Sequence, residues 1–459
     1  MPRDLLPAYE LITKKQEAAL RHPDLKSLLV TGPPGCGKTV VALYRADKLV
    51  KKKKEVQVLT YGKVLLSYID RAVSVKQIRI NTSTWHSWFY RHIYKEFGRR
   101  PPQIEKFVVD FPKLFEWYTE RGITQTVFDQ LVIDEGQDLS LDFYRLAVHI
   151  SGNMTVFADE NQAIFEGLNS TIREIRGALK KFDPKEIKLT KNFRNTKNIA
   201  EFASLFVTKE LETGSTDLPD RKGERPLLCK AGYMDEQTDY IIKHIKRYPN
   251  HQVGVFLPRK SSVKKYYNEL ESVYGRKVQY YTGGKEMEAP DFGRDGIFVV
   301  TYWSAKGLEF DDVFVPDLQD FDLDDGGPVK KMQLYVVFSR PRERLFLMFT
   351  GNLSTSFRRI IDENSELIKE ITLGSHQEED EDEATEDEIP MSEFCDKIEA
   401  NFDEAEAKRI IEKLKENYSC PFVDKKKLED CIEQNIPGKT AKNYLKLLLE
   451  ELLGEYEDE

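Results

Sequence analysis

The chain contains a complete phosphate-binding loop, with the pattern G-x-x-x-x-G-K-T, at Gly32–Thr39. The apolar residues 28–30 before it predict a buried strand, and residues 40–50 after it predict a helix. The loop requires this strand–loop–helix order, because its glycines let backbone N–H groups face a phosphate at a helix N-terminus. A glycine-rich turn without a ligand is the alternative, but the full pattern and its flanks favour the phosphate loop.

The loop carries the residue types that hold a nucleoside triphosphate and a metal ion. Lys38 would reach the β- and γ-phosphates, and Thr39 would bind Mg²⁺. ATP and Mg²⁺ are therefore the expected cofactors. The other loop positions would surround the phosphates with backbone groups; they are Gly32, Pro33, Pro34, Gly35, Cys36 and Gly37.

Two adjacent carboxylates, Asp134 and Glu135, follow the apolar run at residues 131–133. Asp134 is placed to bind Mg²⁺ together with Thr39, and Glu135 to orient or deprotonate an attacking water. An acidic turn at a strand end is the alternative. The phosphate loop upstream favours the catalytic interpretation.

Apolar periodicity predicts two α/β blocks and a helical end. The first block covers 1–193, with a short helical insertion at about 88–126, and the second covers 194–375. Residues 376–390 predict a disordered acidic linker, and residues 391–459 a small α-helical domain. The expected strands are 27–31, 56–60, 79–82, 130–134 and 154–158 in the first block, then 227–231, 252–257, 278–281, 297–301, 312–315 and 344–349 in the second.

Charge is distributed unevenly along the chain, whose net charge is −9. Residues 378–388 hold nine acidic and no basic residues, and residues 390–459 hold 18 acidic against 11 basic ones. The first 377 residues therefore carry +7, which suits a polyanionic partner such as nucleic acid, although surface solubility also explains it. The acidic run is interpreted as a solvated linker, with autoinhibition by nucleic-acid mimicry as the less favoured alternative.

The C-terminal domain shows helical stripes of apolar residues, which predict a docking module for a protein partner. A helix-turn-helix near 435–438 is less favoured because the local charge is negative. The sequence contains no run of about 18 apolar residues, so no membrane span is expected, and the N-terminus has no apolar signal region. The five cysteines are scattered and predict reduced thiols in the cytoplasm rather than a zinc site, so a cytoplasmic, nucleoid-associated protein is expected.

Ordered motifs between residues 12 and 350 resemble those of the UvrD/Rep-like superfamily 1A helicases. The segments that carry the resemblance are 12–20, 81–88, 134–138 (Asp-Glu-Gly-Gln-Asp), 156–165, 189–196, 300–310 (with Ala-Lys-Gly-Leu-Glu-Phe) and 334–345. The resemblance implies two RecA-like P-loop NTPase domains. It also implies an ATP-dependent single-stranded DNA translocase or helicase that moves 3′→5′.

The resemblance assigns nucleotide roles to residues outside the loop. Gln16 is similar to the glutamine that contacts adenine, Phe193 to the aromatic residue that stacks on it, and Gln162 to the glutamine that senses the γ-phosphate. Arg194 and Arg340 would neutralise charge on the transferred phosphoryl group. The resemblance further implies that Glu309 contacts the sugar or the phosphates.

For nucleic acid, hydroxyls and lysine would hold phosphates, and aromatic rings would stack on bases. Trp88 and Phe89 are assigned to packing, and a core position is the alternative for any single aromatic residue among the expected contacts. RNA remains an alternative substrate, because nothing in the motifs selects for the 2′-OH. The expected nucleic-acid contacts are Thr60, Tyr61, Lys63, Thr84, Trp85, His86, Phe165, Thr301 and Trp303.

The chain departs from the family pattern in size and in a few residues. The short spacing between Arg194 and Thr301 leaves no room for the large insertion of many members, so a compact motor is expected. Residue 303 is Trp where histidine is common, Ser339 and Pro341 flank Arg340, and an arginine near the base is absent after Phe165. The alternative function is a DNA-dependent regulatory or sensor ATPase that controls a partner, such as a nuclease, in a repair or antiviral defence complex.

Overall fold

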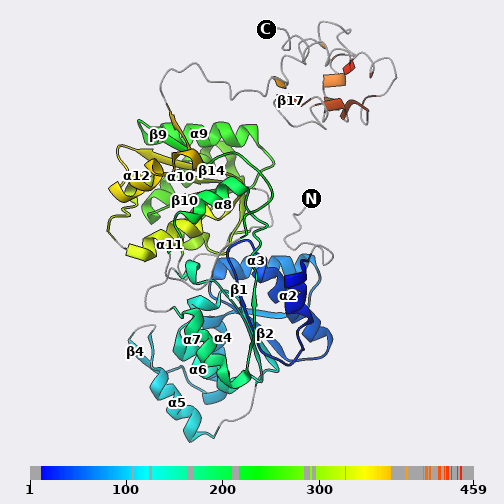
Figure 1. Cartoon of the computed structure of the whole chain (residues 1–459), viewed down its shortest axis with the longest axis vertical. Helices are drawn as coiled ribbons and strands as arrows, with labels where there is room; N and C mark the ends of the chain where they lie inside the picture. Colours follow the sequence, from blue (N-terminus) through cyan, green and yellow to red (C-terminus); the bar gives the residue numbers. More distant parts are fainter. Residues whose placement is uncertain are drawn as a thin grey trace. The chain divides into compact units, whose positions relative to one another are not determined.

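The computed structural model describes residues 12–105, 108–122, 127–163, 169–208, 217–283, 290–291, 296–325, 327–373 and 388–390, and scattered positions from 398 to 446. Residues 1–239 and 250–373 form one compact unit, and residues 240–249 and 374–459 form another. The first unit holds two parallel β-sheets with helices on their faces (Figure 1). We call the part around the first sheet the N-terminal lobe (residues 12–193) and the part around the second sheet the C-terminal lobe (residues 194–239 and 250–373).

The N-terminal lobe is built on a six-stranded sheet in the order β3-β2-β6-β7-β1-β8, and all of its strand pairs are parallel. Parallel neighbours require crossover connections, which the helices between the strands supply. Its strands are β1 (Leu28–Thr31), β2 (Val56–Thr60), β3 (Asn81–Thr84), β6 (Gln130–Ile133), β7 (Met154–Ala158) and β8 (Lys185–Lys188). Its helices are α1 (Lys14–Arg21), α2 (Lys38–Lys51), α3 (Lys63–Val75), α4 (Trp85–Phe97), α5 (Phe111–Glu120), α6 (Leu141–Ile150) and α7 (Ile172–Ala178).

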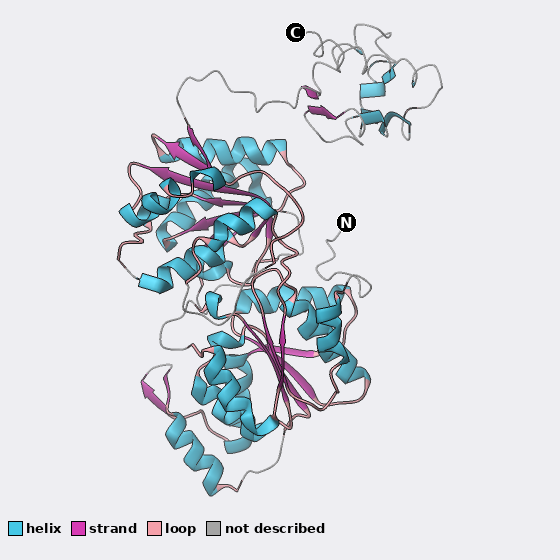
Figure 2. Cartoon of the chain, in the orientation of Figure 1, coloured by secondary structure: helices cyan, strands magenta, loops and turns pink. Residues whose placement is uncertain are grey.

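Both faces of this sheet are buried at its central strands, because successive apolar side chains of each strand point to opposite sides. On β1, Leu29 packs with the side chains of α4 to α7, whereas Val30 packs with those of α1 and α2. Figure 2 shows helices on both sides of the sheet. The carboxyl ends of β1 and β6 then lead into the phosphate loop and into Asp134.

The C-terminal lobe has a seven-stranded parallel sheet in the order β11-β12-β10-β13-β14-β9-β15. Side chains of α8, α11 and α12 form a large core with one face of it, and α10 contacts β10, β11 and β12. The strands are β9 (Leu227–Ala231), β10 (Val253–Leu257), β11 (Val278–Tyr281), β12 (Ile297–Thr301), β13 (Phe310–Val315), β14 (Pro341–Thr350) and β15 (Lys369–Thr372). The helices are α8 (Lys197–Ser204), α10 (Lys260–Tyr274), α11 (Gly327–Phe338) and α12 (Thr355–Asp362), together with the start of α9 (Met234–Arg247), whose residues from Tyr240 on belong to the other unit.

The predicted fold class is confirmed: the chain has two parallel-sheet α/β domains of the RecA-like type. Every strand expected from the sequence is present. Two edge strands, β8 and β15, were missed because Lys-Glu-Ile-Lys and Lys-Glu-Ile-Thr expose their charged residues and bury little. Charged edge strands of this kind limit pairing with other chains, and they lack the apolar run of a central strand.

The insertion predicted at about 88–126 is partly helical. Its described residues include most of α4, which begins earlier at Trp85, and all of α5, with a short antiparallel pair between the two helices, β4 (Gln103–Glu105) and β5 (Val108–Val109). Trp88 and Phe89 lie in the core, as predicted. The proposed domain boundaries themselves stay predictions.

In the second unit, the described positions from 398 to 414 and from 428 to 446 are almost all helical. Ile410, Ile411 and Leu414 of the predicted stripe are buried, and so is Leu445. Residues 376–387 of the predicted linker lie outside the described residues, whereas its last three residues form β16 (Glu388–Pro390), which pairs with β17 (Phe422–Asp424). No helix in the described part of the chain is both long and apolar enough to cross a bilayer.

Candidate functional site

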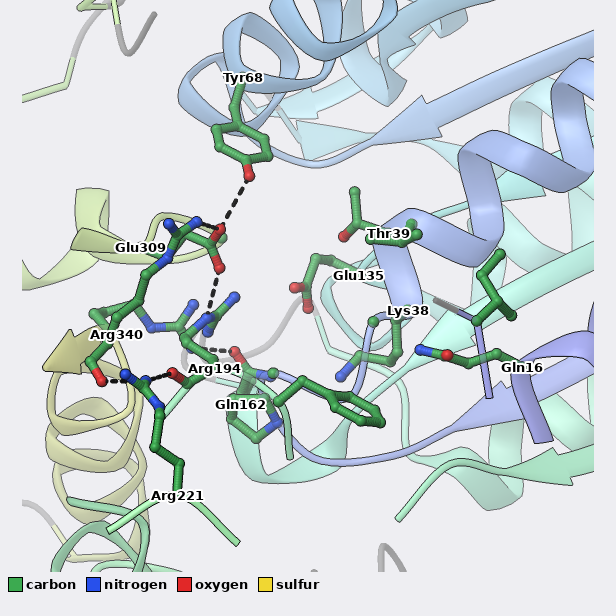
Figure 3. Close-up of a pocket in the computed structure, with 18 residues that line it drawn as sticks. Gln16, Lys38, Thr39, Tyr68, Glu135, Gln162, Arg194, Arg221, Glu309 and Arg340 are labelled. Atoms are coloured by element: carbon green, nitrogen blue, oxygen red, sulfur yellow. Dashed lines mark hydrogen bonds and ion pairs between the residues drawn. The ribbon is translucent and has the colours of Figure 1, made fainter. Parts of the chain in front are cut away.

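A cavity of about 500 Å³ lies between the two lobes, within the size range of small-molecule sites. Both lobes contribute charged side chains to it (Figure 3). The structure therefore brings together most of the residues predicted to act on a nucleotide. Those that line the cavity are Gln16, Pro34, Gly35, Gly37, Lys38, Thr39, Glu135, Gln162, Phe193, Arg194, Glu309 and Arg340.

The phosphate loop is shaped by two glycines with positive φ, Gly35 at 74° and Gly37 at 83°. L-residues rarely adopt this conformation, and at Gly35 there is also no room for a side chain. A Cβ there would lie 2.4 Å from Asn192 Oδ1 and 2.8 Å from Arg194 Cβ. The Phe193 N–H donates to Gly35 O at 2.9 Å, so the loop is joined directly to the segment carrying Phe193 and Arg194.

Lys38 is buried, and its ammonium lies inside the curve of the loop. Its Nζ donates to Gly32 O at 2.7 Å and to Pro33 O at 2.9 Å, and it lies 3.9 Å from Asp159 Oδ2. An ammonium has three donors and no acceptor, so this position suits a group that neutralises phosphate oxygens. Cys36, also in the loop, is buried, and burial raises the pKa of its thiol.

Thr39 and Asp134 form a two-oxygen site at the start of α2. Thr39 Oγ1 donates to Asp134 Oδ2 at 2.7 Å. Burial and the adjacent charge of Glu135 raise the pKa of Asp134 to about 7. A buried carboxylate that already faces another negative charge is stabilised by a divalent cation, and Mg²⁺ takes one or two protein oxygens with phosphate and water. The residues thus fit Mg²⁺, which would neutralise charge on the phosphates.

Glu135 occupies the left-handed backbone region, with φ 54° and ψ 45°, which is uncommon for a residue with a side chain. Its Oε2 accepts from Gln137 Nε2 at 2.5 Å and lies 3.8 Å from Lys306 Nζ. Burial raises the pKa of Glu135, but the positive charges of Lys306 and Lys38 outweigh this and hold the pKa below its ordinary value. The side chain is therefore an ionised carboxylate beside the phosphate loop, as a general base requires.

Arg340 connects the C-terminal lobe to the loop through Gln162. Arg340 Nη2 donates to Gln162 Oε1 at 2.8 Å, and Gln162 Nε2 donates to Asp159 Oδ2 at 2.8 Å. Burial and the charge of Arg194 lower the pKa of Arg340 to about 9, so the guanidinium remains protonated at neutral pH. A buried cation at this place can respond to charge that develops on a phosphoryl group.

Arg194 belongs to a charged cluster around Glu309. Arg194 Nε donates to Glu309 Oε2 at 2.9 Å, and Arg342 pairs with the other oxygen of the same carboxylate. Tyr68, from α3 in the N-terminal lobe, donates to Glu309 Oε1 at 3.2 Å. Burial raises the pKa of Glu309, but the two arginines lower it to about 2. Glu309 therefore holds Arg194 at the cavity as a permanent counter-ion.

The other end of the cavity is less charged. Ile12 and Phe193 line it beside Gln16, and Phe193 is 48% exposed. Gln16 Nε2 donates to Cys36 O at 3.0 Å, and its Oε1 accepts from Thr13 N at 2.9 Å. A half-exposed aromatic ring beside a fixed amide is a suitable surface for a planar, hydrogen-bonding base.

A second cavity, of about 540 Å³, lies next to the first and is also formed by both lobes. Its lining includes four predicted nucleic-acid contacts: Tyr61, Lys63, Thr301 and Trp303. Trp303 is 43% exposed, although it is a large apolar residue. Exposed aromatic rings and lysines in one groove are typical of surfaces that bind single strands.

The remaining predicted nucleic-acid contacts do not line this cavity. Thr60 is buried, and Thr84 caps α4 by accepting from Ser87 N at 3.3 Å. Trp85 packs in the core against Phe143, with ring centroids 5.6 Å apart, so the structure gives it the packing role that was the alternative for each aromatic residue of this set. His86 is exposed, and its ring lies next to that of Trp85, with centroids 3.7 Å apart and the planes tilted by 37°. Phe165 lies outside the described residues.

Several residues of the site were missed in the sequence. Lys306 lies within the Ala-Lys-Gly-Leu-Glu-Phe motif, and Arg342 follows Arg340 by two positions, so a closer examination of the motifs could have found them. Tyr68 and Arg221 also line the first cavity, but no motif marks them. Only the three-dimensional arrangement brings these two side chains to the first cavity, which we call the nucleotide cavity.

A family model described as an AAA domain matches residues 15–168, which include the phosphate loop, Glu135 and Gln162. This part of the chain is therefore similar to known P-loop domains. A solved structure, the C-terminal domain of a possible DNA helicase from Lactobacillus plantarum WCFS1, is 20% identical with a TM-score of 0.30. That match covers 39% of this chain and 98% of the other, and it is too loose to support a function. No match was found among curated proteins.

Proposed function

We propose that this chain is an ATP-driven motor on single-stranded DNA, a compact relative of the UvrD/Rep-like superfamily 1A helicases that moves 3′→5′. The similarity of residues 15–168 to AAA domains and the complete phosphate loop support nucleotide binding. The two cavities between RecA-like lobes support a machine in which hydrolysis and strand binding are neighbours. The direction rests on the resemblance of the ordered motifs alone.

One observation carries the proposal: the two cavities meet at Glu135, whose carboxylate lies 3.8 Å from Lys306 Nζ. Glu135 lines both of them, and Lys306 lines the second. Lys306 Nζ donates to Asp138 Oδ1 at 2.7 Å and to the carbonyl of Gln162. A strand that displaced Lys306 would therefore change the electrostatic environment of the general base. This is a direct route from strand occupancy to hydrolysis.

In the proposed cycle, Lys38 holds the phosphates, and Thr39 and Asp134 hold Mg²⁺. Glu135 accepts the proton of the attacking water, while Arg194 and Arg340 stabilise charge on the phosphoryl group. Because both arginines come from the C-terminal lobe, their attraction to the phosphates would draw the lobes together. Loss of the γ-phosphate would release them, and this alternation would move the strand.

The single strand would lie in the second cavity. Tyr61 and Trp303 offer rings for stacking, which tolerates any base, and Lys63 offers charge for phosphates. These contacts read no sequence, so the proposed motor is not sequence-specific. RNA is the substrate to exclude by experiment, because no described side chain in this cavity selects for deoxyribose.

The test is steady-state ATP hydrolysis with no nucleic acid, single-stranded DNA, duplex DNA and RNA, with Lys38→Ala as the control. The proposal predicts strong stimulation by single-stranded DNA and none in the variant. Stimulation by RNA alone would reassign the substrate. Hydrolysis that persists in Lys38→Ala would reject the proposed site.

A regulatory ATPase is the second candidate function. It is favoured by the separate compact unit that includes residues 374–459, which is suited to docking a partner such as a nuclease. Here occupancy of the two cavities would switch the partner without processive movement. Co-purification of a nuclease with the full chain, together with hydrolysis but no translocation, would support this function over the motor.

A further inference from the structure

A segment outside the sequence motifs runs beside the one that carries Phe193 and Arg194. We call residues 217–225 the strap. The Asp217 N–H donates to Thr190 O at 2.9 Å, and the Lys197 N–H donates to Arg221 O at 2.7 Å. Lys191 and Asp220 form an ion pair at 2.8 Å. The strap therefore contacts this segment both before and after Phe193 and Arg194, at residues 190–191 and at Lys197.

Arg221 is the strap residue that reaches the nucleotide cavity (Figure 3). Its Nη2 donates to Arg194 O at 2.8 Å and to Arg342 O at 2.6 Å, and its Nη1 pairs with Glu343. One guanidinium thus joins two segments that are far apart in the sequence. One of them carries Arg194, and the other carries Arg340 and Arg342.

The contacts explain why an arginine is needed at this position. A guanidinium is planar and has five donors in a fixed fork, so it can hold two carbonyls and a carboxylate at once. A lysine ammonium is a flexible point charge that cannot fix the two backbone segments in one plane. The Arg221 side chain is 43% exposed, so it adds little to the core.

We propose that Arg221 is a positioning residue, which holds the segments of Arg194 and Arg340 in register at the phosphates. The inference rests on the proposed function and adds to it a part that no motif contains. Arg194 and Arg340 act on charge that develops during phosphoryl transfer. A shift of their backbones therefore slows the chemical step more than it weakens nucleotide binding.

The experiment compares Arg221→Ala, Arg221→Lys and Lys222→Ala in strand-stimulated ATP hydrolysis by the full chain. Lys222 is the adjacent exposed residue and does not line the cavity, so it controls for lost charge. We expect kcat to fall by about tenfold to hundredfold in Arg221→Ala, as for a displaced catalytic group, with KM within about threefold. Arg221→Lys should recover only part of kcat, and Lys222→Ala should match the wild type.

A double-mutant cycle with Arg194→Ala separates positioning from a general structural effect. If Arg221 acts through Arg194, the double variant is little slower than Arg194→Ala alone. If the losses of kcat in the two single variants are fully additive, or if Arg221→Ala raises KM without lowering kcat, the inference is overturned while the proposed function stays intact. A wild-type chain without Lys38-dependent hydrolysis would instead reject the proposed function, and the inference with it.

Discussion

Among single residues, Glu135 matters most for the proposed hydrolysis. It combines a strained backbone, an ionised carboxylate and a place at both cavities. Strain of this kind persists only where the surroundings enforce it, which is common at functional sites. Here the Glu135 N–H donates to Asp134 Oδ1 at 3.1 Å and its carbonyl accepts from the Asp138 N–H at 3.0 Å, which hold the backbone, while Gln137 and Lys306 hold the carboxylate.

Glu135→Gln should therefore remove hydrolysis while preserving nucleotide binding. Glutamine keeps the shape but cannot accept the proton of water, so kcat should fall by about 10²- to 10⁴-fold. The affinity for a fluorescent ATP analogue should stay within about threefold of wild type. Glu363→Gln, at an exposed glutamate, is the control and should be silent. Unchanged kcat in Glu135→Gln would show that another group is the base.

A substitution of Trp303 tests whether the single strand binds in the second cavity, which we call the strand cavity. Stacking on an aromatic ring is worth about 1–3 kcal/mol per base, so Trp303→Ala should weaken single-stranded DNA binding by about 5- to 150-fold. ATP affinity should not change, because Trp303 does not line the nucleotide cavity. Tyr94→Ala is the matched control, since Tyr94 is 62% exposed and lines neither cavity. Equal DNA affinities for the two variants would place the strand elsewhere.

His251 gives a prediction about pH and stability. Its Nδ1 lies 2.7 Å from the buried Asp312 Oδ2, and this hydrogen bond raises the pKa of His251 above 6.5. The stabilisation is complete below the pKa of the unfolded chain, and it is lost as pH rises through the higher pKa of the folded chain. His251→Gln should thus lower the melting temperature by about 2 °C or more at pH 5.5, and by less at pH 8.5. The same loss at both pH values would contradict the pairing.

At the scale of elements, the phosphate loop and the segment at 190–195 act as one unit. Gly35 lacks a side chain because Asn192 and Arg194 occupy its space. Any change in the loop is therefore transmitted to Arg194. The strap extends this unit, because its backbone also forms hydrogen bonds with Thr190 of this segment and with Lys197.

Gly35→Ala should move the segment that carries Arg194 and lower kcat/KM for ATP by tenfold or more, on the scale of a displacement of about 1 Å. Gly98→Ala is the control, because Gly98 also has a positive φ, of 68°, but nothing lies within 4 Å of its absent Cβ. Both variants have backbone strain, and only Gly35→Ala has the clash. Equal activities would show that the contact with Arg194 does not matter.

The elements also show what could be predicted from the sequence. Apolar runs and the phosphate loop identify the central strands, because burial on both faces of a parallel sheet demands uninterrupted apolar residues. The charged edge strands β8 and β15 lack that signal. For the site, the motifs predict Lys38, Asp134 and Arg340, but Tyr68 and Arg221 enter only through the packing of distant segments. A motif can also indicate a residue that does not reach the site: Trp85 lies in a motif, but its ring packs in the core.

Over the whole first unit, the proposed motor requires that the nucleotide cavity and the strand cavity are coupled. Glu135, Asp138 and Lys306 form the physical connection, and they come from both lobes. Coupling between two binding sites is reciprocal, so it can be measured without hydrolysis. Each ligand must change the affinity of the other by the same factor.

The most direct measurement is the Kd for single-stranded DNA with and without a non-hydrolysable ATP analogue and Mg²⁺. The wild type should show Kd values that differ by about 5- to 150-fold, and Lys306→Ala should reduce the difference to within about twofold. Lys260→Ala, which lines the same cavity, should weaken binding in both states and keep the ratio. Equal Kd values for the wild type with and without the analogue would contradict the account, because the two cavities would then be independent.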